Sequence, residues 1–586
     1  MATDVQMEIT GGAWLVSEPA DVFSPERLTE DHRMISATAH EFVTNEVMPA
    51  IDQLEKKDWT LARELVAKAG TLGLVGTDVP EEFGGVDLDK AASVLVGEAV
   101  GRSASFATTF GAQTGLAIIP ILCFGTDDQK QRYLPRIASG EIVGAYALSE
   151  STSGSDALAA RARAARQPDG SFVLSGEKMW VTNGGFADVF IVFAKVDGEQ
   201  FSSFIVDRSF AGVTSGKEEH KMGLHGSSTT PLVLQDVPVP ATGLLGEVGK
   251  GHRVALNTLN YGRFKLAAMC TGGAKTAIAE AATYASTRKQ FNQAIANFGA
   301  IQHKLGEMTA RLYGAESALY RTCGLLDASL AGSQRLPASL EEFAIEASIL
   351  KVAASEMLDY VLDENVQIHG GNGFVKDYPA ERHYRDARVN RIFEGTNEIN
   401  RLLVPGMFAR RAIKGALPII SAAKALQDEL LSPPSLPSAS ADRLAPERTL
   451  VAGMKKMALA VLGTAMQTYG EKMADQQEVL GFASDIIMDA FVAESALLRA
   501  LQSATDDAGR RSLHEAAALV VIHTAASRVD ASSKEALAAM SQGDMLRTLL
   551  AAGRRWLKST PADLVRARRA LAAETVRRRR YVWDAQ

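Results

Sequence analysis

The sequence predicts a mainly α-helical protein with one central β-domain. Three observations lead to this prediction. Apolar residues recur at helical spacing up to about residue 145. Short β-rich runs separated by Gly, Asn and Asp turns then continue to about residue 246. Long Ala- and Leu-rich amphipathic stretches follow, and the 586 residues suffice for several domains and a large buried core.

The order of these sequence patterns divides the chain into six segments. In the first helical stretch we predict Ser24 as N-cap and Pro25 at the first helical position. The Pro- and Ser-rich run LSPPSLPSASAD, Leu431 to Asp442, indicates a linker before a last helical module. The predicted segments are an N-terminal extension (1–28), an N-terminal helical domain (29–145), a middle β-domain (146–250), a second helical domain (251–413), a linker (414–444) and a C-terminal helical domain (445–586).

The net charge of −7 gives no support for nucleic-acid binding, but the charge is uneven. From Arg547 onward there are 11 Lys and Arg against 3 Asp and Glu, a charge of +8 that leaves −15 for the rest. A basic tail on an acidic body predicts an acidic partner, such as anionic lipid or another protein, or else a solvated helix face. The closing RRRRYVW, Arg577 to Trp583, mixes charge with aromatic residues. Segments at a membrane interface do so too, and so does an ordinary exposed helix end.

The three cysteines, Cys123, Cys270 and Cys323, are far apart and form no CxxC or disulfide framework, which fits a reducing compartment. The opening MATDVQMEITGG lacks a basic, apolar leader, and no apolar run reaches the roughly 18 residues that span a bilayer. We expect a cytoplasmic, bacterial protein that is at most peripheral to the inner membrane.

Familiar catalytic motifs are absent from the sequence. There is no GxGxxG after a strand, no GxxxxGK[ST], no HExxH, no GxSxG and no Cys/His cluster with zinc spacing. We therefore expect neither a Rossmann dinucleotide site nor a metal ion.

Three other clusters carry candidate chemistry. The first, YALSESTSGSDA (Tyr146 to Ala157), offers hydroxyls and close backbone approach to a polar ligand, although such a run is often only a loop. The second, KMWVTNGG (Lys178 to Gly185), places a Trp and a Thr on one face of a strand. There they could pack on a flat ring or simply fill a core. The third, VQIHGGNGF (Val366 to Phe374), has doubled glycines that permit close approach and leads to RDARVNRIFEGTNEI.

Together with TRKQFNQAIANFGAIQ (Thr287 to Gln302), these clusters resemble the acyl-CoA dehydrogenase family in order and spacing, over roughly Thr29 to Phe408. The added C-terminal helical module makes the chain most similar to the very-long-chain branch. The resemblance implies the acyl-CoA dehydrogenase fold: an N-terminal helical domain, a β-barrel-like middle domain and a four-helix bundle, here with the extra C-terminal domain. It also implies a homodimer in which FAD lies between the β-domain and the bundle and reaches the partner subunit.

The resemblance further implies which residues form the site. Substrate contacts fall on Ser155, Asn260, Arg263, Phe393 and Gly395, and the small residues Gly111, Ala112 and Gly115 lie at the closed end of the acyl pocket. FAD contacts fall on Tyr146, Leu148, Ser149, Ser155, Trp180, Val181, Thr182, Arg288, Phe291, Gln367, Ile368, Gly370, Gly371, Thr396 and Glu398.

Glu394, in the EGT context that the family uses for its base, is the implied catalytic residue. A fatty acyl thioester has a weakly acidic α C–H, so its removal needs a positioned base, and the β-hydride needs an acceptor such as flavin N5. The implied reaction converts long-chain acyl-CoA to trans-2-enoyl-CoA in fatty-acid β-oxidation. Its electrons pass to an electron-transfer flavoprotein. The Glu394 N–H and a ribityl hydroxyl would stabilise the charge on the thioester oxygen.

Three alternatives share the fold: an acyl-CoA oxidase, a flavin monooxygenase and a non-catalytic assembly or scaffold protein. Retention of Glu394 argues against the monooxygenase, which needs no such base. The intact flavin motifs argue against the scaffold. Two positions depart from the family pattern: Ser151 stands where a proline is common, and His369 where a small or aliphatic residue is usual.

Overall fold

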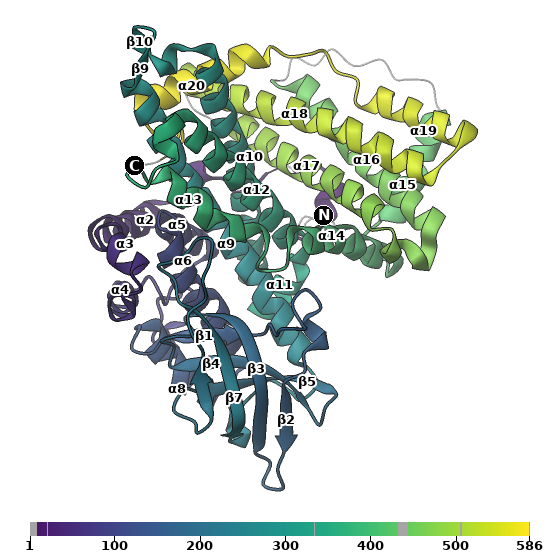
Figure 1. Cartoon of the computed structure of the whole chain (residues 1–586). Helices are drawn as coiled ribbons and strands as arrows, with labels where there is room; N and C mark the ends of the chain where they lie inside the picture. Colours follow the sequence, from purple (N-terminus) through teal and green to yellow (C-terminus); the bar gives the residue numbers. More distant parts are fainter. Residues whose placement is uncertain (1–8, 20, 333, 432–442, 504–506, 585–586) are drawn as a thin grey trace.

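The computed structural model describes residues 9–584 except residues 20, 333, 432–442 and 504–506. Figure 1 shows three layers: a β-sheet at one end, a helical layer in the middle, and a second group of helices that covers one flank of that layer. This arrangement confirms the predicted fold class, with helices before and after a central sheet and an extra C-terminal helical domain.

The N-terminal helical layer begins five residues later than predicted. Pro25 starts only a three-residue 3-10 turn, and Ser24 makes no side-chain cap, so that part of the prediction was wrong. Thr29 is the actual cap: its hydroxyl accepts from the His32 N–H in a reciprocal capping box. The helices are α2 (Glu30–Phe42), α3 (Met48–Glu55), α4 (Trp59–Thr71), α5 (Lys90–Val100), α6 (Ala104–Gly111), α7 (Ile119–Phe124) and α8 (Asp127–Ala138), with a π-helical turn, η5 (Ala112–Ile118), joining α6 to α7.

The middle domain is an eight-stranded sheet. Its order is β6-β7-β3-β2-β4-β5-β8, and β1 pairs in parallel with β4. A register shift between Lys178 and Val181 bends β3, and Trp180 there has a left-handed φ of 56°. The strands are β1 (Gly144–Ala147), β2 (Arg163–Arg166), β3 (Phe172–Thr182), β4 (Val189–Val196), β5 (Gln200–Asp207), β6 (Val213–Ser215), β7 (Thr229–Val239) and β8 (Leu244–Leu245).

The second helical domain is a bundle built around α9, which packs against α5, α10 and α12. At its far end, α9 leads into a small hairpin of β9 (Lys289–Gln290) and β10 (Gln293–Ala294). The helices are α9 (Gly251–Thr287), α10 (Gly299–Ala331), α11 (Leu336–Glu342), α12 (Ala344–His369), α13 (Ala380–Ala387) and α14 (Asn397–Ile413).

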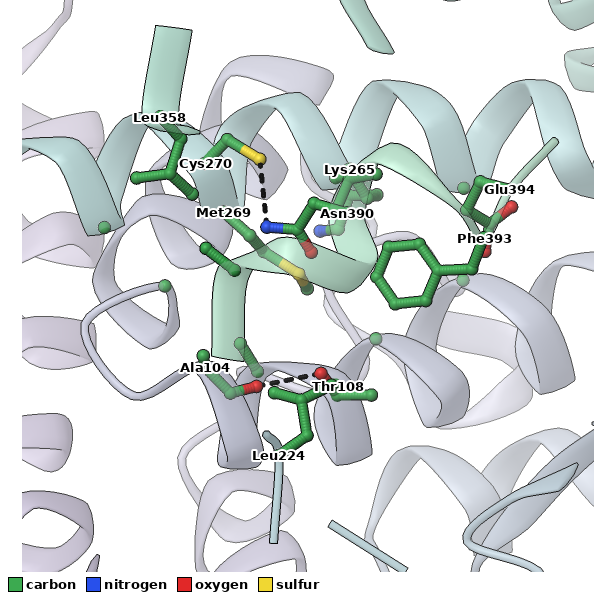
Figure 2. A pocket seen from close by; sticks show the side chains of 18 of the residues that line it. Ala104, Thr108, Leu224, Lys265, Met269, Cys270, Leu358, Asn390, Phe393 and Glu394 are labelled. Carbon is green, nitrogen blue, oxygen red and sulfur yellow. Dashed lines mark hydrogen bonds between the residues drawn. The ribbon is translucent and has the colours of Figure 1, made fainter. Parts of the chain in front are cut away.

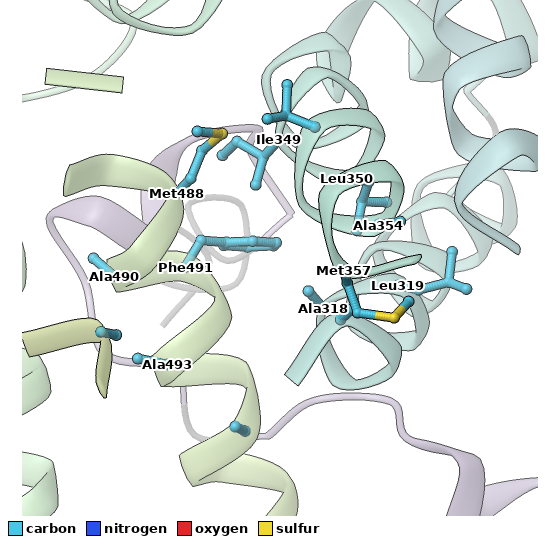
Figure 3. Close-up of a cluster of buried hydrophobic side chains, with 14 of the residues drawn as sticks. Ala318, Leu319, Ile349, Leu350, Ala354, Met357, Met488, Ala490, Phe491 and Ala493 are labelled. Carbon is cyan, nitrogen blue, oxygen red and sulfur yellow. The ribbon is translucent and has the colours of Figure 1, made fainter. Parts of the chain in front are cut away.

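The C-terminal helices share one hydrophobic core with the bundle. In Figure 3, Met488 and Phe491 extend toward the helix that carries Ile349, and Ile349 faces Met488 across that interface. The predicted linker 414–444 was wrong in part, because α15 (Ile419–Leu431) is a helix that packs on α16. Residues 432–442 lie outside the described residues. The remaining helices are α16 (Ala445–Tyr469), α17 (Gln477–Gln502), α18 (Ala508–Met540), α19 (Gly543–Trp556) and α20 (Leu564–Arg578).

The aromatic residues at the end of the tail are buried. Both predictions for this segment, a membrane-interface segment and an exposed helix end, were therefore wrong. Tyr581 is 0% and Trp583 9% exposed. The Tyr581 hydroxyl donates to Glu316 Oε2 at 2.9 Å, and the Trp583 indole donates to His514 Nε2 at 2.9 Å. The segment anchors the C-terminal domain on the bundle, so it gives no support for membrane contact.

Part of the basic tail also has acidic partners inside the chain. Arg568 donates to Glu307 of α10 at 2.7 Å, and Arg577 and Arg578 both donate to Glu574. Glu574 is already counted in the tail's charge of +8, so of these two carboxylates only Glu307 comes from the rest of the chain.

Two helical segments are long and apolar enough to cross a bilayer, Ala104–Phe124 and Ala445–Asp475, although none was expected. Their apolar windows are 72% and 61% buried within the protein. Both segments therefore use their apolar faces for internal packing.

Candidate active site

The loop that carries Glu394 has an unusual backbone. Glu394 and Gly395 take successive left-handed conformations, with φ of 57° and 78°. A non-glycine residue in this region is uncommon and costs free energy, so the surrounding contacts must hold it. Arg263 Nε donates to the Glu394 carbonyl at 3.1 Å, and Asn400 Nδ2 donates to the Gly395 carbonyl at 2.8 Å. Thr396 then caps α14 by accepting from the Ile399 N–H, so the helix start fixes the loop's exit.

The Glu394 carboxylate is poised to take up a proton. Its Oε2 is buried and has no hydrogen-bond partner among the residues that the structure describes. Burial raises the pKa of Glu394 from 4.5 to about 7, against the opposing charges of Arg263 and Lys351. Burial disfavours the ionised form, and a carboxylate with a pKa near the working pH is an effective general base.

Gly262 of α9 provides the space for this carboxylate. A Cβ at position 262 would lie 2.6 Å from Glu394 Oε2 and 2.9 Å from its Cδ, closer than real Cβ contacts come. The absence of a side chain at this turn of α9 therefore lets the carboxylate rest against the helix.

We expect Gly262→Ala to lower kcat by roughly tenfold to a hundredfold, because a misplacement of about 1 Å at a reacting group can cost about 100-fold. The purified variant should be no less stable, since Ala favours a helix over Gly by about 1 kcal/mol. Steady-state turnover and a thermal melt measure the two effects.

The matched control is Gly481→Ala within another helix, α17, where no atom lies within 4 Å of the new Cβ and no contact is made with the cavity beside Glu394. It should gain similar helix stability and keep its turnover. Equal turnover in Gly262→Ala and wild type would show that Gly262 does not position the base.

A mostly apolar cavity of about 110 Å³ extends from Glu394 along α9 (Figure 2). The residues of α9 that line it recur every three or four positions and so form one stripe: Gly262, Lys265, Leu266, Met269, Cys270, Gly273 and Thr276. Opposite this stripe lie small residues of α6 and η5, including the predicted Gly111, Ala112 and Gly115. Lys265 is no free cation here, because its ammonium donates to Ser93 O and Oγ at 2.9 and 2.6 Å.

Residues predicted to contact the flavin ring lie at the mouth of this cavity. Thr182 lines the same cavity as Glu394, and Trp180 is 57% exposed beside it on β3. The Tyr146 hydroxyl is buried and finds no hydrogen-bond partner within the described chain. The Tyr146 pKa is raised well above its usual value by burial and by the Glu394 charge. An open tryptophan face and unsatisfied polar atoms near Glu394 fit a flat, polar ring such as that of FAD.

A buried ion pair holds the first predicted flavin segment on β3. Lys178 Nζ donates to Glu150 Oε1 at 2.6 Å and to the Leu148 carbonyl at 3.2 Å. Glu150 also accepts from the Arg161 and Ala162 N–H groups, and Ser149 O accepts from the Met179 N–H. The Tyr146–Ser155 loop is thus a fixed wall of the site.

The other predicted residues fall into three groups. Leu148, Val181 and Ile368 have buried side chains, whereas Ser155 and Glu398 are exposed. Asn260 and Arg263 are buried beneath the Glu394 loop and do not line the cavity. Arg263 Nη1 donates to Asn260 Oδ1, and Asn260 Nδ2 to the Leu340 carbonyl. Arg263 supports the base loop directly and Asn260 supports Arg263, and their predicted contact with substrate stays a prediction.

The third group lies at the opposite end of the bundle. Arg288, Phe291, Gln367, Gly370 and Gly371 are exposed where α9 and α12 end. Arg288 follows Gly262 by 26 residues along one helix, which is about 39 Å at about 1.5 Å per residue. Within one chain, this group does not meet the residues around Glu394.

Sequence reasoning missed several residues that shape the site: Gly262, Lys178, Glu150, Lys351 and Asn390. The Lys178–Glu150 pair joins two motifs, but its partners are 28 positions apart and no local pattern predicts the contact. Gly262 and Lys351 sit in helices where only the tertiary contact reveals their role, and Lys351 donates to Asn397 Oδ1 at 2.6 Å.

Comparison with known proteins matches four parts of the chain to family models. They are described as acyl-CoA dehydrogenase N-terminal domain (29–141), middle domain (145–237) and C-terminal domain (249–406, and a second model at 453–555). A probable acyl-CoA dehydrogenase of Bacillus subtilis (strain 168) is 44% identical over 598 residues, or 99% of both chains. The mitochondrial very long-chain specific acyl-CoA dehydrogenase of Rattus norvegicus is 42% identical over 344 residues, which are 57% of this chain and 51% of the rat protein. A crystal structure of acyl-CoA dehydrogenase complexed with FAD from Bacillus anthracis has a TM-score of 0.95 at 45% identity, over 98% of this chain and 99% of that chain.

Proposed function

This chain belongs to the acyl-CoA dehydrogenase family, and from that premise we propose that it oxidises long-chain acyl-CoA thioesters to trans-2-enoyl-CoA. The family makes it an FAD-dependent oxidoreductase. The single observation that carries the proposal is the position of Glu394, a partly desolvated base at the mouth of a long apolar cavity that Thr182 also lines.

In the proposed mechanism, Glu394 removes the α-proton of the bound thioester. Arg263 and Asn400 hold the carbonyls of the base loop, and Gly262 lets the carboxylate lie against α9. The Glu394 N–H donates to the thioester oxygen as negative charge develops there. Tyr146, Trp180 and Thr182 would hold FAD, which would supply the acceptor for the β-hydrogen. An acyl chain that fills the cavity expels water and keeps the Glu394 pKa raised.

The length of the cavity supports a long acyl chain. Its stripe on α9 runs from Gly262 to Thr276, 14 residues, or about 21 Å at about 1.5 Å per residue. An extended polypeptide advances roughly 3.5 Å per three backbone bonds, so an all-trans chain advances about 1.2 Å per bond. The lining stripe thus runs for the length of about 18 bonds. The cavity between its walls holds about 110 Å³, so a long fatty acyl group would widen it on binding.

An anaerobic titration with palmitoyl-CoA, followed at the flavin absorbance, tests the proposal. We expect rapid bleaching with palmitoyl-CoA and much weaker bleaching with butyryl-CoA. Gly273→Leu should block the far end and move the preference to shorter chains, since Gly273 lines the cavity 11 residues beyond Gly262. The measurement is kcat/KM across a series of saturated thioesters in both proteins.

Two results would contradict this proposal. No bleaching with any saturated thioester would overturn the activity itself. Efficient oxidation of butyryl-CoA, with a chain-length profile that Gly273→Leu does not alter, would overturn the long-chain assignment alone.

We also propose a homodimer. The two groups of predicted flavin residues lie about 39 Å apart along α9, so one chain alone does not bring them to a single FAD. At the far end Phe291 and Phe374 are 88% and 86% exposed, as residues that pack on a second subunit would be in an isolated chain. A second copy would bring its Phe291 end to the Glu394 end of the first.

The dimer is tested by sedimentation together with flavin content. We expect a dimer that retains FAD, and a mostly monomeric Phe291→Asp variant that loses it. The exposed Met545 of α19, replaced by Asp, is the matched control and should remain dimeric. A wild-type monomer with a full complement of FAD would refute the proposal.

We propose an electron-transfer flavoprotein as the electron acceptor. Peroxide formation in air, at the rate of substrate oxidation, would instead identify an oxidase. Three free cysteines support a reducing location such as a bacterial cytoplasm.

A further inference from the structure

Asn390 places an amide in the middle of the acyl cavity. It belongs to the turn η10 (Arg388–Arg391), four residues before Glu394, and lines the same cavity. Its Nδ2 lies 3.7 Å from Cys270 Sγ, and its amide oxygen is turned away from that sulfur (Figure 2). A thiol is only a weak hydrogen-bond acceptor. The burial of Cys270 raises its pKa to about 12, so this sulfur carries no charge.

Three other polar side chains that line the cavity, Thr108, Thr276 and Lys265, already have hydrogen-bond partners. Thr108 Oγ1 donates to the Ala104 carbonyl at 2.8 Å, and Thr276 Oγ1 to the Gly272 carbonyl at 3.1 Å. Lys265 is held by Ser93, so its methylene stem is what lines the cavity. Asn390 differs, because no hydrogen bond from its amide to nitrogen or oxygen occurs within the described part of the chain. Asn390 is half-buried, so water reaches its amide until an acyl chain fills the cavity, and an amide that then lacks such partners is costly.

The amide lies at a defined depth. Glu394 rests against Gly262 and Asn390 against Cys270, which are eight residues apart on α9. This spacing is about 12 Å along the helix axis, or about ten bonds of an extended acyl chain. A chain whose C2 lies at Glu394 therefore passes Asn390 near C12.

We propose that Asn390 makes this site selective for long acyl-CoA thioesters that carry a hydroxyl or oxo group near C12. The inference rests on the proposed function. A hydroxyl at that depth donates to the Asn390 oxygen, and a hydroxyl or oxo oxygen accepts from its nitrogen. A saturated chain leaves the amide without a partner once water is expelled, and sites built to bind a substrate hydroxyl discriminate strongly against analogues that lack it.

The test compares 12-hydroxystearoyl-CoA with stearoyl-CoA in anaerobic flavin reduction and steady-state turnover. We expect wild type to favour the hydroxylated thioester by about tenfold or more in kcat/KM. Asn390→Leu, which has a similar volume and no polar atom, should invert that preference. Thr276→Val is the matched control, because its hydroxyl is satisfied within α9, and it should keep the wild-type ratio.

A second pair of substrates tests the depth. A hydroxyl at C6 should bring no advantage, because it lies short of Asn390. A wild-type ratio near one, or an equal ratio in wild type and Asn390→Leu, would overturn the inference while flavin reduction by both thioesters still upholds the proposed function. If neither thioester reduces the flavin, the proposed function fails and the inference fails with it.

Discussion

Glu394→Gln should lower the rate of flavin reduction by long-chain acyl-CoA by about 100- to 10,000-fold, the range contributed by a positioned general base. The amide is nearly isosteric but cannot accept the α-proton. Arg263 and Asn400 bind the loop through its backbone, so the loop should keep its shape. Rapid mixing without oxygen, with absorbance near 450 nm, measures the rate. Calorimetry should show that the variant still binds acyl-CoA.

The control for this assignment is the pH dependence of the wild-type enzyme. The pKa of Glu394 is raised to about 7, and the base acts only when ionised. The kcat/KM of wild type should therefore fall as the pH drops through about 7, and the residual rate of Glu394→Gln should not follow that curve. Undiminished flavin reduction in the variant would assign the proton transfer to another group.

Arg499→Leu should weaken the docking of the C-terminal domain by about 3–5 kcal/mol, the usual cost of breaking a buried ion pair. Arg499 is fully buried, and donates to Glu316 of α10 at 2.7 Å and to Glu26 of the N-terminal extension at 2.7 Å. Its loss would take the arginine from Glu26 and leave Lys275, 2.8 Å from Glu316, as the remaining cation at that carboxylate. Urea unfolding, followed by tryptophan fluorescence because Trp583 packs nearby, should show an earlier transition.

Arg577→Leu is the matched control, since Arg577 is exposed and pairs only with Glu574 of its own helix among the described residues. It should unfold like wild type. Coincident unfolding curves for Arg499→Leu and wild type would mean that the C-terminal domain is held by its apolar contacts alone.

The general fold was predictable because periodicity records which faces are buried. The N-cap of α2 is Thr29 and not Ser24. Its capping box uses His32 at the third helical position, where the usual pattern has Glu or Gln, so the sequence pattern did not reveal it. The α15 helix was missed because it directly precedes the Pro-rich run and was included in the predicted linker. The position of Tyr581 and Trp583 was predicted wrongly. A run of arginines followed by aromatic residues occurs in segments at a membrane interface, and here the same pattern packs against a buried ion-pair network.

Site residues were predictable where a short continuous motif contains them. The EGT run predicted the Glu394 loop. The TTFGAQTGLA run predicted small residues in the cavity, but at its closed end. Gly115 instead lies by Tyr261, near Glu394, and Gly111 lies by Met269, midway along α9.

Asn260 and Arg263 were predicted to contact substrate, and nothing in the sequence indicates their second role, which is to support the base loop from beneath. Their direction depends on the rotation of α9 against α11 and α14. The roles of Gly262 and Asn390 depend on tertiary contacts, with the Glu394 carboxylate and with the cavity, which no local sequence pattern predicts.

The length of α9 has a genetic consequence. In the proposed dimer one rigid helix serves two reaction centres, its own at Gly262 and its neighbour's at Arg288. An allele altered at Glu394 and another altered at Arg288 would each give an inactive protein. In a mixed dimer both defects would fall on the same centre, and the other centre would be wild type throughout. The two alleles should therefore complement each other and restore about half of the activity to each mixed dimer.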